Sequence, residues 1–124
     1  MNNVSATNKK VLIIDDEDRI LQSIKKQLKD VEYITEFTND PKNGLTLIEK
    51  NSYHLILCDI RMKPIDGIDV LRYVRKKYPG LSFIILTGYI DDKIIEKAKE
   101  IGVTDILLKP IRKKLLIETI HKYI

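Results

Sequence analysis

The sequence predicts an open, doubly wound α/β fold built on a five-stranded parallel sheet. Short apolar runs alternate with longer amphipathic segments five times along 124 residues, and this strict alternation is typical of parallel sheets with right-handed crossovers. The runs near the middle of the chain show almost no polar alternation, which indicates strands covered on both faces. Five units are too few for an eight-stranded barrel, so an open sheet is expected.

Five short runs rich in isoleucine, leucine and valine are expected to form the strands. These runs are Val11–Ile14, Tyr33–Phe37, Leu55–Cys58, Phe83–Leu86 and Ile106–Leu108. Each is followed by a segment in which apolar residues recur at helical spacing. The apolar stripes are Ile20, Leu21, Ile24 and Leu28; Leu45 and Ile48; Val70, Leu71 and Val74; Ile90, Ile94, Ile95, Ala98 and Ile101; and Ile111, Leu115, Leu116 and Ile120.

Residues at the expected helix ends support this division. Glu17 or Asp18 is suited to cap the first helix. Asp40 and Pro41 are suited to open the second, as capping residue and first-turn residue. Gly102 is suited to end the fourth, because glycine readily takes the left-handed conformation of a helix C-cap.

The composition excludes several classes of protein. Hydrophobic residues make up 44% and charged residues 32% of the chain, which is typical of a folded domain and not of a disordered chain. The apolar runs are far shorter than the roughly 20 residues of a membrane-spanning helix, so no membrane association is expected. The single cysteine, Cys58, excludes an internal disulfide framework and suits a reducing compartment, so a cytoplasmic location is expected. At a strand position beside Asp59, Cys58 is expected to be a buried hydrophobic residue.

The acidic residues indicate more about function than the basic residues do. The net charge is +4, but the basic residues are spread along the chain, tryptophan is absent and only two phenylalanines are present. A surface that stacks on bases is therefore not expected, and no direct nucleic-acid contact is predicted. The acidic residues of 15–18, in contrast, follow directly after the first apolar run.

Polar side chains follow four of the five predicted strands. Asp15 and Asp16 come after the first strand, Asp59 after the third, Thr87 after the fourth and Lys109 after the fifth. Because ligands of open α/β sheets bind at the carboxyl ends of the strands, these side chains are expected to gather at one edge. Each alone has an ordinary explanation, such as a helix cap, and their joint occurrence is what indicates a site.

The chemistry of such a cluster is restrictive. Two carboxylates about 4 Å apart repel each other by about 4 kcal/mol at an effective dielectric constant of about 20, so either one takes up a proton or a cation binds between them. Oxygen ligands favour a hard divalent ion such as Mg²⁺. A carboxylate can itself attack phosphorus and form an aspartyl phosphate, with Mg²⁺ and Lys109 stabilising the charge on the phosphoryl oxygens. The Thr87 hydroxyl can bind one of those oxygens.

The chain resembles the receiver domain of bacterial two-component response regulators over residues 9–124, with residues 1–8 expected to be a flexible tail. The matching pieces are Val11–Glu17, Leu57–Met62, Asp66-Gly67, Ile85–Gly88 and Leu108–Pro110. The resemblance implies the flavodoxin-like, CheY-like (βα)5 sandwich. It also implies a phosphoacceptor switch in a phosphorelay, and not an enzyme beyond the transfer to its own aspartate and autodephosphorylation.

The resemblance also implies a role for each residue of the cluster. Asp59 would be the phosphoacceptor and would take its phosphoryl group from a histidine of a sensor kinase or of a phosphotransfer protein. Lys109 would pair with the phosphoryl group, and Thr87 would be the switch hydroxyl. The ligands of Mg²⁺ would be Asp15, Asp16, Asp59 and the backbone carbonyl of Arg61. Pro110 is expected to fix the chain path beside Lys109 through a cis bond, and Gly67 and Gly88 to permit close approach or turns near the site.

Phosphorylation adds a net charge of about −1.5 to −2 at neutral pH. By resemblance, that charge changes the surface formed by the fourth helix, the fifth strand and the fifth helix. This surface is the expected homodimer face and the expected contact for a downstream output partner or a fused output domain. Its apolar contacts are expected from Ile90, Ile94, Ile95 and either Leu116 or Ile117.

Three features depart from the family pattern. Lys63 stands where the family commonly has proline, and Pro64 follows it. Ile106 stands where the family often has an aromatic switch residue, and Tyr89 is a candidate replacement. No output domain is expected within these 124 residues.

Ile106 supports an alternative, a receiver-like interaction module that works without phosphorylation. A phosphatase with an aspartate nucleophile is not favoured, because Arg61 stands where such enzymes carry their second acid.

Overall fold

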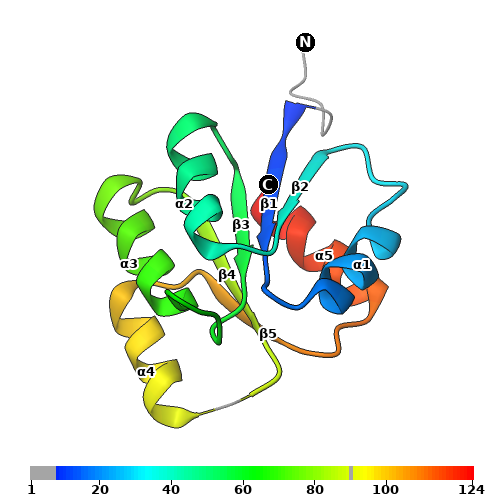
Figure 1. The fold of residues 1–124 in the computed structure, drawn as a ribbon. Coiled ribbons are helices and arrows are strands. Elements are labelled where there is room, and N and C mark those ends of the chain that lie inside the picture. The colour runs from blue at the N-terminus through cyan, green and yellow to red at the C-terminus, as the bar shows by residue number, and fades with distance from the viewer. Residues whose placement is uncertain (1–7, 90) are drawn as a thin grey trace.

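The computed structural model describes residues 8–89 and 91–124, and within them five strands and five helices alternate (Figure 1). The strands are β1 (Lys10–Ile14), β2 (Ile34–Thr38), β3 (Leu55–Cys58), β4 (Ser82–Thr87) and β5 (Asp105–Leu108). The helices are α1 (Asp18–Gln27), α2 (Pro41–Lys50), α3 (Gly67–Lys77), α4 (Asp92–Ile101) and α5 (Lys113–Tyr123). The predicted order of elements is confirmed. The predicted tail lies outside the described residues except for Asn8, and so does Ile90.

The five strands form one parallel sheet in the order β2-β1-β3-β4-β5. α1 and α5 cover one face of this sheet, and α2, α3 and α4 cover the other (Figure 1). The chain moves outward from β1 to β2 and then crosses back to β3. This reversal places a topological switch point at the carboxyl ends of β1 and β3, where ligands bind in folds of this type.

The central strands are buried on both faces, as their continuous apolar sequence predicts. The residues of β1 from Val11 to Ile14 and all of β3 are at most 1% exposed. Leu12, Ile14, Ile56 and Cys58 face α2, α3 and α4, and their sequence neighbours on the same strands face α1 and α5. Cys58 is a free, fully buried thiol, in agreement with its prediction as a core residue.

The helix ends follow the predicted signals in α2 and α4. The Asp40 side chain accepts a hydrogen bond from the Lys42 N–H at 3.0 Å, and Pro41 occupies the first turn. Gly102 ends α4 with a φ of 110°, a conformation that only glycine takes at no steric cost. None of the helices in the described part of the chain is long and apolar enough to cross a membrane.

Arg75 of α3 connects three other parts of the fold. Its Nε donates to the Gly102 carbonyl at the end of α4 at 2.7 Å, and one terminal nitrogen donates to the Leu81 carbonyl at 2.6 Å. The other terminal nitrogen donates to the Thr104 hydroxyl, at 3.2 Å, and this hydroxyl also accepts from the Phe83 N–H at 2.8 Å. One guanidinium therefore satisfies acceptors at the end of α4 and before β4 and β5.

Arg75→Met should lower the free energy of unfolding by about 1–3 kcal/mol, because the Gly102 and Leu81 carbonyls lose the donor that Arg75 supplies. Arg72→Met changes an exposed arginine on the same helix and should shift stability by less than about 0.5 kcal/mol. Urea unfolding of both variants tests this expectation. Equal losses in the two variants would show that the hydrogen bonds of Arg75 add nothing beyond a general effect of arginine on α3.

Candidate functional site at the carboxyl end of the sheet

The carboxyl ends of β1, β3 and β5 bring three predicted site residues into contact. The Nζ of Lys109 lies 2.6 Å from Oδ2 of Asp15 and 3.2 Å from Oδ2 of Asp59. Both aspartates are buried, with 1% and 4% of their surface exposed. The prediction that strand ends gather these side chains is thus met for Asp15, Asp59 and Lys109.

Backbone hydrogen bonds hold the three side chains in place. Oδ1 of Asp59 accepts from the Ile60 N–H at 2.8 Å, and Oδ1 of Asp15 accepts from the Glu17 N–H at 2.9 Å. The Lys109 N–H donates to the Thr87 carbonyl at 2.8 Å, which fixes the end of β5 beside β4. The Lys109–Pro110 peptide bond is cis, as the sequence suggested, and so is the Lys63–Pro64 bond.

Burial dominates the electrostatics of the cluster. It raises the pKa values of Asp15 and Asp59 above their usual range, although Lys109 partly opposes the effect. Burial alone would lower the pKa of Lys109, but its contacts with the two carboxylates outweigh burial and raise that pKa. The site therefore carries negative charge that the protein stabilises only in part, which is the condition for binding a cation.

Glu17 is a third carboxylate of the cluster, which the sequence analysis did not foresee. Asp15, Glu17 and Asp59 each place one oxygen within 4.8 Å of the others, and Oε1 of Glu17 lies 3.7 Å from Nζ of Lys109. Glu17 occupies the N-cap of α1 without capping it through its side chain. Asp16 is exposed and lies outside this group of three, but its charge raises the pKa of Asp59. In the sequence, the feature that could have indicated this role for Glu17 is its position two residues after Asp15.

The Thr87 hydroxyl is bonded to its own loop. It accepts from the Tyr89 N–H at 3.2 Å and lies 3.2 Å from the Tyr89 carbonyl oxygen. The Tyr89 side chain is 47% exposed, and the Arg61 guanidinium lies 3.8 Å from the centre of its ring. This cation–π contact joins the loops after β3 and β4. Ile106 packs partly buried against the core, whereas Tyr89 lies at the surface.

Gly67 at the start of α3 packs directly on the backbone of Asp59. A Cβ at this position would lie 2.2 Å from the Asp59 carbonyl oxygen and 2.9 Å from Cα of Ile60. The Gly67 N–H donates to the Ile60 carbonyl at 2.8 Å. The predicted close approach is confirmed for Gly67. Gly88 lies at the bend after β4, the other role expected of it, and a Cβ there would meet Lys109 at an ordinary 3.8 Å.

On α5, either Leu116 or Ile117 was expected to contribute to the surface of α4, β5 and α5. Leu116 is fully buried in the core beneath α5 and does not contribute, whereas Ile117 is half-buried. Its neighbour Leu115 is 51% exposed and Leu108 of β5 is 50% exposed. Ile95 and Ile106 border a shallow groove of about 450 Å³ between α4 and β5. Exposed apolar side chains are thus present on β5 and α5, and Leu115 was not expected among them.

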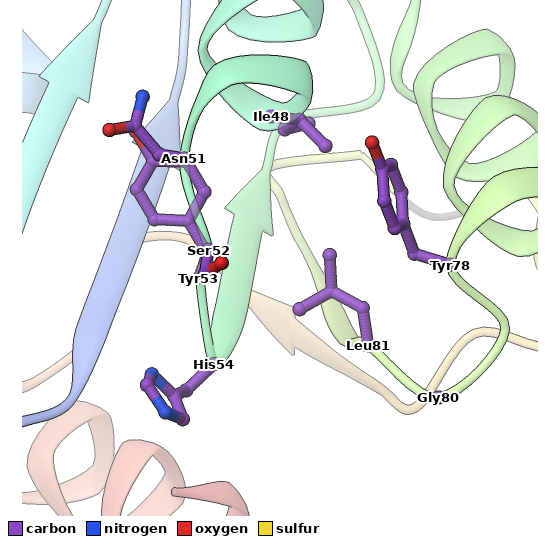
Figure 2. Close-up of a pocket in the computed structure, with 8 residues that line it drawn as sticks. All are labelled: Ile48, Asn51, Ser52, Tyr53, His54, Tyr78, Gly80 and Leu81. Carbon is purple, nitrogen blue, oxygen red and sulfur yellow. The ribbon is translucent and has the colours of Figure 1, made fainter.

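A separate pocket of about 360 Å³ lies at the amino ends of β3 and β4 (Figure 2). Ile48, Leu81 and Tyr78 form much of its wall (Figure 2). The polar groups of two further lining residues are engaged elsewhere in the protein, since Asn51 bonds to the Leu47 carbonyl and Tyr53 donates to Glu36 at 2.5 Å. The pocket is at the opposite end of the strands from the carboxylates and is not part of their site.

Comparisons with known proteins agree with this geometry. Residues 11–121 match the family described as the response regulator receiver domain. A solved receiver domain protein (CheY-like) from Methanospirillum hungatei superposes with a TM-score of 0.87 at 31% identity, over 92% of this chain and 91% of that one. The chain thus belongs to the receiver domain family of response regulators, the phosphoacceptor switches of two-component signalling. Members of this family generally bind Mg²⁺ at an acidic site and typically act as switches rather than enzymes.

Two curated relatives are longer proteins. The hydrogenase transcriptional regulatory protein HoxA of Cupriavidus necator is 31% identical over 113 residues, which cover 90% of this chain and 23% of HoxA. The transcriptional regulatory protein CusR of Escherichia coli is 30% identical over 103 residues, which cover 82% of this chain and 44% of CusR. The chain therefore spans less than half the length of either relative.

Gly67→Ala should displace the Asp59 backbone and lower both stability and phosphorylation, with a loss of about 1–3 kcal/mol from overpacking. Gly80→Ala is the matched control, because a Cβ at Gly80 meets nothing within 4 Å. Urea unfolding and the rate of phosphorylation by acetyl phosphate should be measured for both. A Gly67→Ala protein that behaves like Gly80→Ala would contradict the close packing of α3 on Asp59.

Asp59→Asn should raise the free energy of unfolding at neutral pH in buffer without Mg²⁺. The folded state raises the pKa of Asp59 above 3.8, so the ionised carboxylate costs stability that an amide does not. The cost is absent below pH 3.8 and develops as the pH rises through the folded pKa. The gain should therefore shrink as the pH is lowered.

Urea unfolding across this pH range measures the effect, with Asp30→Asn at an exposed site as the control. A loss of stability on Asp59→Asn at neutral pH would show that the ion pair with Lys109 outweighs the cost of burial.

Proposed function

We propose that this domain is a Mg²⁺-dependent phosphoacceptor switch and that Asp59 receives the phosphoryl group. The observation that carries the proposal is the contact of Lys109 with the buried carboxylates of Asp15 and Asp59 at the switch point of the sheet. A hollow of about 440 Å³ is bordered by Asp16, Arg61 and the loop that follows Asp59. This hollow is the proposed side of approach for a phosphodonor.

The orientation of Asp59 selects one of its oxygens as the nucleophile. Oδ1 is held by the Ile60 N–H, and Oδ2 faces Lys109. Oδ2 would attack phosphorus of a phosphohistidine, forming an O–P bond while the N–P bond breaks and the imidazole leaves. Lys109 would then pair with the phosphoryl oxygens and stabilise their charge. In autodephosphorylation, water would attack phosphorus and the bond to Oδ2 would break, which returns the carboxylate and releases inorganic phosphate. No other catalysis is proposed.

The residues present fit a hard divalent cation. The proposed ligands of Mg²⁺ are Asp15, Asp16, Asp59 and the backbone carbonyl of Arg61, and Glu17 adds a further carboxylate to the cluster. All of these donors are oxygen atoms, the type that Mg²⁺ prefers. Burial raises the pKa values of Asp15 and Asp59, so a cation here would offset the cost of their charge. When bound, Mg²⁺ supplies positive charge that stabilises the transferring phosphoryl group.

Thr87 would couple phosphorylation to the surface. Both contacts of its hydroxyl to Tyr89 are 3.2 Å long, and a phosphoryl group adds about −1.5 to −2 of charge nearby. A hydroxyl drawn toward that charge would move the loop between β4 and α4. The surface of α4, β5 and α5, with Leu108 and Leu115 exposed, is the proposed homodimer and output-binding face.

The proposed donor is a sensor histidine kinase or a phosphotransfer protein. An output partner or a fused output domain is proposed because HoxA and CusR are longer than the aligned region. A cytoplasmic location completes the proposal, since the free thiol of Cys58 suits a reducing compartment.

Incubation with acetyl phosphate and Mg²⁺ should add the mass of one phosphoryl group to the intact protein. Asp59→Asn and a metal-free sample should show no adduct, because one removes the nucleophile and the other the cation. Intact mass spectrometry measures the adduct, and beryllofluoride binding followed by NMR separates rapid hydrolysis from an inactive site. A protein that neither gains the mass nor binds beryllofluoride would favour the interaction module that works without phosphorylation.

A further inference from the structure

Within the part of the chain that the structure describes, no strand pairs with the outer backbone groups of β2. β2 is an edge of the sheet. The Ile34 N–H donates to the Lys9 carbonyl, and the Thr38 carbonyl accepts from the Asp15 N–H. Because backbone groups alternate along a strand, those of residues 34, 36 and 38 face β1, and those of Thr35 and Phe37 face outward.

β2 lacks the features that usually protect an edge strand. Its sequence contains no lysine and no proline, two residues with which proteins block pairing at sheet edges. Its one charged side chain, Glu36, is engaged within the domain by Lys10 Nζ at 3.3 Å and by the Tyr53 hydroxyl at 2.5 Å. Ile34 is 47% exposed. The edge is therefore free to accept another strand.

A groove of about 800 Å³ runs along this edge and carries positive charge. Thr35 and Phe37 line it together with Lys25 of α1 and Lys29 in the turn after α1. Glu36 lines it too, but its carboxylate is paired with Lys10. The Nζ of Lys25 lies 5.3 Å from the centre of the Phe37 ring. Neither Lys25 nor Lys29 forms an ion pair with any residue in the part of the chain that the structure describes. The groove thus offers unpaired backbone groups beside two uncompensated cations.

We propose that the β2 edge binds an extended acidic segment of a partner protein, which adds a strand to the sheet. The backbone of Thr35 and Phe37 would supply the hydrogen bonds, and Lys25 and Lys29 would select acidic side chains. A second copy of this chain is a poorer occupant, because the one acidic side chain of its β2, Glu36, is already paired with Lys10 and offers no free charge to Lys25 and Lys29. This interaction does not depend on phosphorylation of Asp59.

The test uses the whole chain and a capped peptide of alternating valine and glutamate, about six residues long. NMR and hydrogen exchange should show binding that protects the Thr35 and Phe37 amides. The same peptide with lysine in place of glutamate should bind about tenfold more weakly or less well still. An N-methylated acidic peptide should not bind, because it cannot donate hydrogen bonds to the edge.

Two variants separate the backbone from the charge. Thr35→Pro removes an outward N–H and leaves the bonds to β1 intact, a placement that edge strands tolerate, and it should abolish binding. Lys25→Glu with Lys29→Glu should weaken binding of the acidic peptide about tenfold, whereas Lys26→Glu, an exposed residue of α1 outside the groove, should not. Circular dichroism and urea unfolding check that each variant is folded.

Three results would overturn the proposal. The first is equal binding of the acidic and basic peptides, which would remove the role of the lysines. The second is unchanged binding by folded Thr35→Pro, which would remove the role of the strand edge. The third is protection of the Thr35 and Phe37 amides that rises with protein concentration without peptide, because a second copy would then occupy the groove.

Discussion

The contact of one lysine with two buried carboxylates is the constraint around which this domain is arranged. Lys109 reaches Asp15 and Asp59 from the end of β5, and each of the three residues stands where a different strand ends. Burial raises the pKa values of both aspartates despite the lysine. Ionising the two carboxylates is therefore harder in the folded protein than in water, although their contacts raise the pKa of Lys109 and favour its charged form. The two hydrophobic cores pack on either side of the sheet that carries these residues.

The two loops beside Asp59 are held to different degrees. The loop from β3 to α3 is fixed by the bond from Gly67 to Ile60 at 2.8 Å and by direct packing of the glycine on the Asp59 backbone. The loop from β4 to α4 is held at Thr87 by two contacts of 3.2 Å to Tyr89. When a charge is added at Asp59, the loop from β3 to α3 would therefore stay in place, and the loop from β4 to α4 would move more easily. This difference gives a physical reason for a response directed toward α4 and β5.

The sequence was sufficient for the fold and for most of the site because both depend on simple rules. Apolar runs and helical spacing mark the elements, and strand ends in a parallel sheet share one edge, which brings Asp15, Asp59 and Lys109 together. The direction of single side chains was not predictable in the same way. Leu115 and Leu116 both fit the apolar stripe of α5, and only packing against the sheet buries the second. Likewise, the turn after Asp15 directs Glu17 and not Asp16 into the group of carboxylates.

The sheet leaves two kinds of chemical group unsatisfied, one at the ends of β1 and β3 and the other on β2, which pairs with β1. At the centre of the sheet, these groups are the charged carboxylates of Asp15 and Asp59. At the edge, they are the outward N–H and C=O groups of β2. One hydrogen bond joins the two regions, because the Asp15 N–H donates to the Thr38 carbonyl at 3.2 Å at the end of β2. A strand added to β2 would order that edge without touching the carboxylates themselves. Any influence of such a partner on the acidic cluster would therefore pass through the backbone of β1 and not through the side chains of the site.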